Sequence, residues 1–332
     1  MRITSLEVCR ATRPPACLTF FVALVSCMSA GHCVAQNYPN KPIRMIVPFT
    51  PGGGTDLISR LLARGMLESL GQPVVIENRG GASGNIGTEL AAKSAADGYT
   101  LLFHTGSFSI NPYVYPSAKY NPVKDFSAIS LTATAPQLLV AHASLSVKSV
   151  PELIALAKTT RLTYATPGVA TVGHLSGELL RLSANVDLVH IPYKGSGAAI
   201  TDLLGGQVNM MFSAPGAVIP HVRSGKLRAL AITSAKREPG LEDVPTFVEV
   251  GFPAVQVLNW FGVLTVAGTP APIIRKLNQE IVRIVALPDV KERIAASGYT
   301  PVTNSPREFE MFLVSEDVKW KKVVKDANVH LD

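Results

Sequence analysis

Several short loops rich in glycine and hydroxyl-bearing residues have the chemistry to hold an anion. Each follows a short apolar run and precedes a helix-like segment. Glycines let the backbone approach a ligand closely, hydroxyls and backbone N–H groups donate hydrogen bonds, and a helix N-terminus adds partial positive charge. The loops cover residues 51–56, 79–85, 104–109, 166–173 and 213–216. The sequence therefore predicts a site that holds a small polar anion, such as a carboxylate.

The residue types needed to transform such an anion are not combined in the sequence. No GxSxG motif marks a serine nucleophile, and the scattered carboxylates form no evident acid/base pair across two loops. His174 and His190 are candidate bases or metal ligands, but no His pair has the i, i+4 spacing of a zinc site and no acidic cluster accompanies them. We therefore expect no catalytic residue, no metal and no cofactor.

The loop Pro-Gly-Gly-Gly-Thr-Asp at 51–56 allows two interpretations. It is not a P-loop, because no Gly-Lys-Ser/Thr follows, and it lacks the last glycine of a dinucleotide-binding fingerprint. It is either an anion-binding turn or a tight turn in which Thr55 or Asp56 caps the next helix. Arg79 and Lys194 lie near two of the other loops, where each either pairs with an anion or remains at the surface.

Alternating strands and helices are needed to position these loops, and the sequence has that pattern. A helix over 57–70 has its apolar residues on one face and Gly71 as its stop, and capping boxes at 149–152 and 305–308 open two more helices. Two α/β blocks, at 43–103 and 162–233, predict doubly wound sheets whose ligands lie beyond the carboxyl ends of the strands. We expect the two blocks to face each other across a cleft, with the last helices covering the first block.

Length and composition agree with a two-domain globular protein. The chain has 332 residues, of which 47% are hydrophobic, so a disordered chain is excluded. The net charge of +7 is modest, and there is no run of five Lys or Arg. This charge gives a weak bias toward anionic ligands and argues against a nucleic-acid partner.

The N-terminus is typical of a signal peptide. Arginines at 2, 10 and 13 precede an apolar run over 18–28, which is too short to span a membrane, and small residues precede Gln36. We expect residues 1–35 to be removed on export to the periplasm. A lipoprotein-type cleavage that leaves an acylated Cys27 is the less favoured alternative. All four cysteines lie in this segment, so the mature chain is expected to have no thiol.

Longer motifs resemble the periplasmic solute receptors of tripartite tricarboxylate transporters, also called Bug-type receptors. The first is YPNKPIRMIVPF at 38–49 followed by GGGTD at 52–56, and another is HIPYKG at 190–195. Further matching motifs lie at 75–79, 84–87, 97–100, 121–126, 201–207, 225–230 and 243–246. The resemblance covers nearly the whole mature chain.

This resemblance implies an α/β fold of the type II periplasmic-binding-protein (Venus flytrap) class. Each lobe would be a mostly parallel sheet flanked by helices, and two linking strands, near 138–142 and 255–260, would join the lobes. Lobe 1 would comprise residues 37–139 plus 258–332, and lobe 2 residues 140–257. A carboxylate would be held by backbone amides, hydroxyls and bridging waters. The positions that match the family's ligand loops are Phe49, Thr50, Gly53, Thr55, Asp56, Ala82, Thr105, Ser107, Thr166, Thr171 and Ser213.

Two departures from the family's pattern affect the identity of the ligand. Receptors of this family often carry an Asp where this chain has Ser213, and 166–171 differs from the commoner Ser/Gly-rich form. The implied function is a monomeric receptor that delivers an organic acid to the membrane permease of a tripartite tricarboxylate transporter. Two alternatives stay open: a receptor that signals to a membrane sensor kinase, and a secreted hydrolase or lyase acting on a carboxylate.

Overall fold

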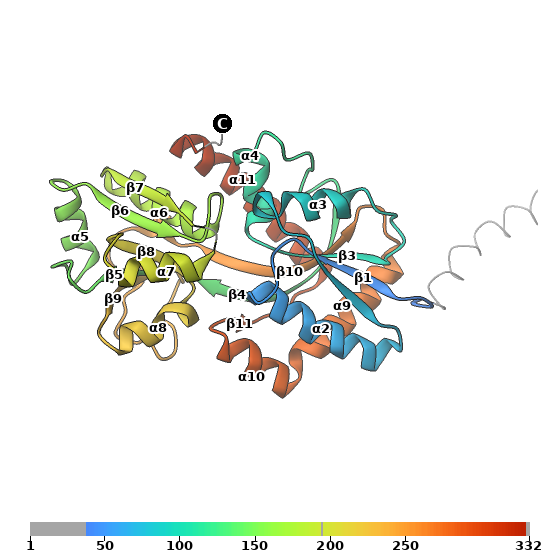
Figure 1. Ribbon diagram of the computed structural model, residues 1–332. Helices are drawn as coiled ribbons and strands as arrows, with labels where there is room; N and C mark the ends of the chain where they lie inside the picture. Colours follow the sequence, from blue (N-terminus) through green and yellow to red (C-terminus); the bar gives the residue numbers. More distant parts are fainter. Residues whose placement is uncertain (1–37, 194, 330–332) are drawn as a thin grey trace, which may run out of the picture. The chain divides into compact units, whose positions relative to one another are not determined.

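The structure, a computed structural model, describes residues 38–193 and 195–329 (Figure 1). The predicted signal peptide, the four cysteines and Lys194 lie outside the described residues. The described residues from Lys41 onward belong to one compact unit. No helix within the described ranges is long and apolar enough to cross a membrane.

The first of two β-sheets has the strand order β11-β4-β10-β3-β1-β2. Its strands are β1 (Ile43–Val47), β2 (Val74–Asn78), β3 (Thr100–Thr105), β4 (Phe126–Pro136), β10 (Leu258–Val266) and β11 (Thr300–Pro301). The helices that pack with it are α2 (Gly54–Leu70), α3 (Asn85–Ala92), α4 (Ser107–Val114), α9 (Ala271–Ala286), α10 (Pro288–Ala296) and α11 (Pro306–Ala327). Helices α2 and α9 contact each other, as α4 does α3 and α11.

The second sheet has the strand order β7-β6-β8-β5-β9. Its strands are β5 (Leu138–His142), β6 (Leu162–Thr166), β7 (Leu188–Pro192), β8 (Met210–Ser213) and β9 (Leu227–Ile232). Its helices are α5 (Val150–Ala157), α6 (Val172–Ala184), α7 (Ser196–Leu204) and α8 (Pro215–Arg223). Short 3-10 turns, Ala82–Gly84 and Pro253–Val255, complete the described helices. The α/β two-lobed fold predicted from the sequence is confirmed.

Local sequence signals set the helix ends closely. The helix predicted over 57–70 ends at Leu70 with Gly71 in the left-handed conformation (φ 69°), as a C-terminal glycine allows. It begins earlier than predicted, at Gly54, so Gly53 and not Thr55 or Asp56 is the N-cap residue. Ser305 and Glu308 form the predicted reciprocal capping box of α11, and the Ser149 hydroxyl accepts the N–H of Glu152 at the start of α5.

Both sheets are mixed, which corrects the expectation of mostly parallel sheets. Strands β1, β2 and β3 are parallel, and so are β6, β7 and β8, but β10 runs antiparallel to β3 and β5 antiparallel to β8. The reason is the crossing of the chain between sheets. A strand that arrives from the other sheet enters at the edge where its new neighbours end, so it must run against them.

The two crossing segments are linked through Thr233, which follows β9, where the chain passes between the sheets. Strand β4 ends at Pro136 and β5 begins at Leu138, so the chain changes sheets at Gln137, and the predicted link at 138–142 already belongs to the second sheet. The Gln137 N–H donates to Thr233 Oγ1 at 2.8 Å, and this hydroxyl donates to the Val257 carbonyl at 2.6 Å. The crossover is therefore a defined polar junction.

Helix α11 packs on both lobes. Phe309 and Leu313, in its first half, lie in the core of the first sheet, as predicted for the last helices. Trp320 and Val324, in its second half, lie in the core of the second sheet. Sequence periodicity identified this apolar face but not its change of partner along the helix.

Candidate functional site

The loops that follow β1, β2 and β3 contact one another at one edge of the first sheet. The Asn78 side-chain amide donates to the Phe49 carbonyl at 3.1 Å, and the ring of Phe49 packs edge-on against His104 at 5.4 Å. The Asn111 amide donates to the carbonyl of Ser83 at 2.8 Å. Because the parallel strands end together, three of the predicted ligand loops form one surface.

Asp56 stabilises the first of these loops through its carboxylate. It accepts hydrogen bonds from the Gly52 N–H, from Arg60 and from the Asn78 amide, at 3.0–3.1 Å. Burial raises the pKa of Asp56, but the hydrogen bonds from Arg60, Gly52 and Asn78 outweigh burial and lower the pKa below its usual value. The side chain is 9% exposed and is fully engaged within its own loop and its neighbours.

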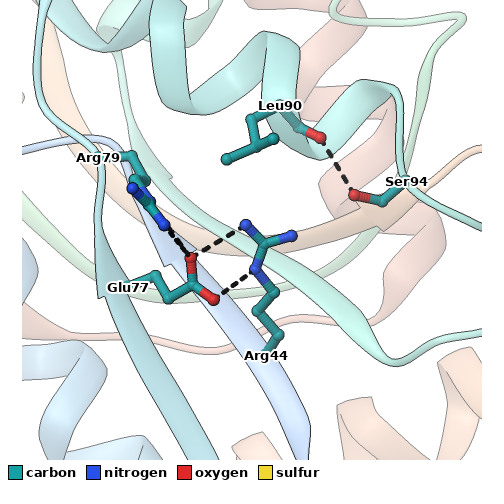
Figure 2. Close-up of polar contacts among 5 residues, drawn as sticks. All are labelled: Arg44, Glu77, Arg79, Leu90 and Ser94. Atoms are coloured by element: carbon teal, nitrogen blue, oxygen red, sulfur yellow. Dashed lines mark hydrogen bonds and ion pairs between the residues drawn. The ribbon is translucent and has the colours of Figure 1, made fainter.

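Arg79, a candidate anion partner, is paired with a carboxylate. Figure 2 shows the guanidinium groups of Arg79 and Arg44 both directed at Glu77. The shortest contacts are 2.6 Å from Arg44 and 3.1 Å from Arg79. The hydrogen bond from Arg44 is the main cause that lowers the pKa of Glu77. Arg79 therefore already has a counter-ion on the surface of strand β2.

Loops of the second sheet converge in the same way. The Tyr193 N–H donates to the Thr166 carbonyl at 3.0 Å and thereby joins the loops after β7 and β6. The hydroxyls of Thr166 and Thr171 both donate to the Gly168 carbonyl, at 3.0 and 2.8 Å. The Thr171 hydroxyl also accepts the N–H of His174 and is thus the N-cap of α6. These hydroxyls hold the loop in shape.

Left-handed backbone conformations occur at alanine or serine in one loop of each lobe, whereas the other two described non-glycine residues with this conformation, Asn185 and Asn328, are helix C-caps. Ala82 and Ser83 have φ values of 47° and 52°, and Ala170 has a φ of 57°. Such conformations cost free energy in non-glycine residues and persist where the surrounding structure enforces them, often at binding sites. The backbone thus indicates the two loops that the sequence also predicted.

The two strained loops meet. The Ser83 hydroxyl donates to the Val169 carbonyl at 3.1 Å and lies 2.8 Å from the hydroxyl of Tyr115. Nearby, a Cβ atom on Gly106 would come within 2.7 Å of the side chain of Val172, so the start of α4 lies close to the start of α6. Loops from both sheets therefore contact each other at the strand ends.

The predicted site residues differ in how far the structure buries them. Thr105 and Ser107 are buried and lie 3.2 Å apart by their hydroxyl oxygens, and Thr55 is buried in the first turn of α2. Thr50, Gly53 and Ala82 are exposed, and Phe49 is half-buried. Ser213 is buried and donates to the Ala214 carbonyl within its own loop. These hydrogen bonds of Thr105, Ser107 and Ser213 are therefore made within their own loops.

Several buried polar atoms of the first lobe have no hydrogen-bond partner among the described residues. They are Asn85 Nδ2, His104 Nε2, Ser109 Oγ, Asn111 Oδ1 and Trp260 Nε1. All lie in or beside the loops after β2 and β3, or in β10 beneath α4. Burial lowers the pKa of His104 to about 3, so its ring is neutral. Buried polar atoms that lack protein partners are normally satisfied by water or by a ligand.

Residues that the sequence did not identify complete the site. The Asn259 side chain, at the start of β10, accepts the Gly106 N–H at 3.1 Å. The Tyr299 hydroxyl lies against Gly54, where a Cβ atom would be 2.2 Å away. Neither residue belongs to a glycine-rich loop, and no local pattern distinguishes them. Their roles follow from the chain's return to the first sheet.

Within the described residues no side-chain cluster is suited to a metal ion, and a surface groove lies away from these loops. Residues 38–193 and 195–329 contain no group of three His, Cys, Asp or Glu side chains that could hold a metal ion. A surface groove of about 530 Å³ lies between β4, α9 and α11, with Arg275 and Arg307 in its lining, and contains none of the predicted site residues.

Two mixed α/β sheets, joined by crossing strands and meeting through strand-end loops, define a two-lobed solute-binding protein of the periplasmic-binding-protein type. Residues 58–329 match the tripartite tricarboxylate transporter family receptor, and the chain belongs to this family. It is 40% identical to protein BugT of Bordetella pertussis over 96% of this chain and 99% of BugT.

Two solved structures of Rhodopseudomonas palustris proteins are similar throughout. One was solved with adipate; it is 36% identical, with a TM-score of 0.79, and covers 89% of this chain and 100% of its own. The other, MatC with bound malate, is 32% identical, with a TM-score of 0.76, and covers 86% of this chain and 100% of its own. The resemblance inferred from the motifs is thereby confirmed.

Proposed function

We propose that this protein is a periplasmic receptor that captures a small organic acid between its two lobes. The observation that carries the proposal is the meeting of two strained loops, through Ser83 and Val169, at the strand ends of both sheets. The similar proteins solved with adipate and malate support a carboxylate as the ligand.

Hydrogen bonds, more than a direct salt bridge, would hold the carboxylate. The loops 51–56, 105–109 and 166–173 contain no Arg or Lys. Arg79 is already paired with Glu77, and Asp56 is engaged by Arg60 and Asn78. The remaining donors are the backbone N–H groups at the starts of α2 and α6, the hydroxyls of Thr105 and Ser107, and bridging water.

Transport is the proposed use of this binding. The receptor would reach the periplasm by cleavage of the signal peptide at 1–35 and would deliver its ligand, as a monomer, to the permease subunits of a tripartite tricarboxylate transporter. Family membership supports this assignment. The proposed lobes are 37–139 plus 258–332 and 140–257, which would close on the ligand without transforming it.

Mass spectrometry of the ligand released from the purified protein, followed by calorimetry, tests the proposal. We expect a carboxylic acid to be released, and adipate, malate or citrate to bind the ligand-free protein while the corresponding amides do not. NMR of the acid after prolonged incubation should find it unchanged. Equal binding of acid and amide, or turnover of the acid, would contradict a carboxylate receptor.

A further inference from the structure

Two imidazole rings, one buried and one half-buried, lie directly behind the loop 166–171 of the second lobe. His174 comes from α6 and His190 from β7, and their rings stack with centroids 3.8 Å apart and planes 14° from parallel. The ring of Tyr164, from β6, packs against both imidazoles, with centroids 5.0 Å from His190 and 6.5 Å from His174. Three elements thus fix the position of the pair.

His190 contacts the first residue of the loop. Its Nε2 lies 2.6 Å from the hydroxyl oxygen of Thr166. That hydroxyl donates its single proton to the Gly168 carbonyl, so His190 Nε2 must carry the proton and donate to Thr166. This assignment fixes the tautomer of His190.

His174 contacts the strained residue of the loop. The Ala170 N–H donates to His174 Nδ1 at 3.2 Å, and Ala170 is completely buried in the left-handed conformation. An acceptor at Nδ1 requires a ring that carries its proton on Nε2. His174 thus supplies a partner for a backbone N–H that the left-handed conformation turns away from regular secondary structure.

The surroundings of the pair favour two neutral rings. Desolvation by burial lowers the pKa of His174 to about 4. Burial, aided by the neighbouring His174 and opposed by the Glu178 carboxylate, lowers the pKa of His190 to about 3. The adjacent carboxylate, Glu178, accepts a hydrogen bond from Tyr164 and pairs with Arg181, both at 2.7 Å. Neutral rings preserve both the acceptor for Ala170 and the donor for Thr166.

We infer that His174 and His190 are positioning residues for ligand binding: together they hold the loop 166–171 in the strained shape that presents its outer edge to the first lobe. This inference rests on the proposed function. The Val169 carbonyl, which accepts from Ser83, lies between the two points that the imidazoles fix, Thr166 and Ala170. Loosening either point would displace the contact between the lobes.

Paired substitutions separate positioning from simple packing. His174→Asn keeps an acceptor near Nδ1, whereas His174→Leu removes it; His190→Gln keeps a donor near Nε2, whereas His190→Phe keeps only the stacked ring. We expect His174→Leu to speed hydrogen exchange of the Ala170 amide about tenfold or more, and His174→Asn to restore most of the protection. Affinity for adipate or malate should fall about tenfold in His174→Leu and His190→Phe. It should be largely retained in His174→Asn and His190→Gln.

A measurement on the unaltered protein covers the case in which a variant does not fold. Nitrogen NMR at neutral pH should find His174 protonated on Nε2 alone and His190 protonated on Nε2. A proton on His174 Nδ1, unchanged Ala170 exchange in His174→Leu, or equal affinity losses in the Asn and Leu variants would overturn the inference. If neither acid binds the unaltered protein, the proposed ligand class fails, while Ala170 exchange still decides the positioning role.

Discussion

The hydroxyl of Ser83 and the carbonyl of Val169 are 3.1 Å apart, although 86 residues separate them in the chain and each belongs to a loop of a different sheet. Ser83 donates to Val169, so it accepts from the hydroxyl of Tyr115 at 2.8 Å. Because the bond exists only when the two loops are close, it belongs to the form of the protein in which the lobes meet.

Ser83→Ala should therefore weaken ligand binding. The closed form loses a hydrogen bond worth about 1 kcal/mol, which corresponds to a roughly fivefold rise in Kd. Calorimetry with adipate and malate measures the change. Ser94→Ala is the matched control, because the Ser94 hydroxyl, just after α3, donates to the Leu90 carbonyl of that helix, within the first lobe (Figure 2). Equal affinities of the two variants would exclude a role for the contact.

Asp56→Asn should lower stability more than affinity. The carboxylate accepts from Gly52, Arg60 and Asn78, and the variant loses its charge while keeping one acceptor oxygen. We expect a loss of about 1–2 kcal/mol near neutral pH. Because the pKa of Asp56 is lowered in the folded state, this stabilisation is complete above the ordinary value of 3.8 and is lost as pH falls through the folded pKa. Urea unfolding and calorimetry of the variant separate the two effects; a large loss of affinity at unchanged stability would instead make Asp56 a ligand contact.

Thr105→Val should weaken carboxylate binding much more than Arg79→Gln. The Thr105 hydroxyl is buried beside that of Ser107, whereas Arg79 is exposed and paired with Glu77. Loss of a buried donor costs about 1–3 kcal/mol, and an exposed charge acts mainly through long-range attraction that salt screens. Binding isotherms at two salt concentrations measure both. The reverse order of effects at moderate salt would favour a salt-bridged anion.

Gly216→Ala should hinder closure of the lobes. A Cβ atom at Gly216 would lie 2.6 Å from the Ser297 carbonyl oxygen and 3.0 Å from Gly298 Cα, so α8 and the turn after α10 would have to separate. We expect about tenfold weaker binding, and a larger radius of gyration with ligand by small-angle scattering. Gly205→Ala is the control, since its nearest neighbour would be an ordinary 3.5 Å away. Indistinguishable scattering from the two liganded variants would argue against this contact as a limit on closure.

Stability should decrease as pH falls from about 6.5 toward 4. Burial lowers the pKa of His104 and His190 to about 3 and that of His174 to about 4. Above pH 7 these rings are neutral in both states and contribute no pH dependence. Below the ordinary pKa of 6.5, these histidines bind protons in the unfolded chain but not in the native chain. The free energy of unfolding therefore falls by up to about 1.4 kcal/mol per pH unit for each histidine.

Urea unfolding at about pH 7.5, 6 and 5 measures this slope. His174→Asn should reduce it by the share of one histidine, because the variant has one fewer group to protonate on unfolding. A free energy of unfolding that stays constant over this range would mean that the three imidazoles titrate normally in the folded protein.

The sequence by itself determined the features that depend on neighbours along the chain. Gly71 could be identified as the end of α2 because a left-handed residue follows many helices, and Ser305 and Glu308 could be identified as a capping box because both partners lie within one turn. The glycine- and hydroxyl-rich loops were likewise visible, and their long motifs identified the family.

Only the tertiary structure decided which groups those loops meet. The mixed direction of the strands follows from the crossing of the chain between the sheets, as at Gln137. The change of partner along α11 arises because its first half packs on the first sheet and its second half on the second sheet. Three contacts form only because folding brings distant segments together. They are the contacts of Asp56 with Asn78, of Ser83 with Val169 and of His174 with His190. Such contacts depend on distances of a few ångströms between strand ends. Those distances are set by the two crossings of the chain between its sheets, so residue types and spacing alone do not predict them.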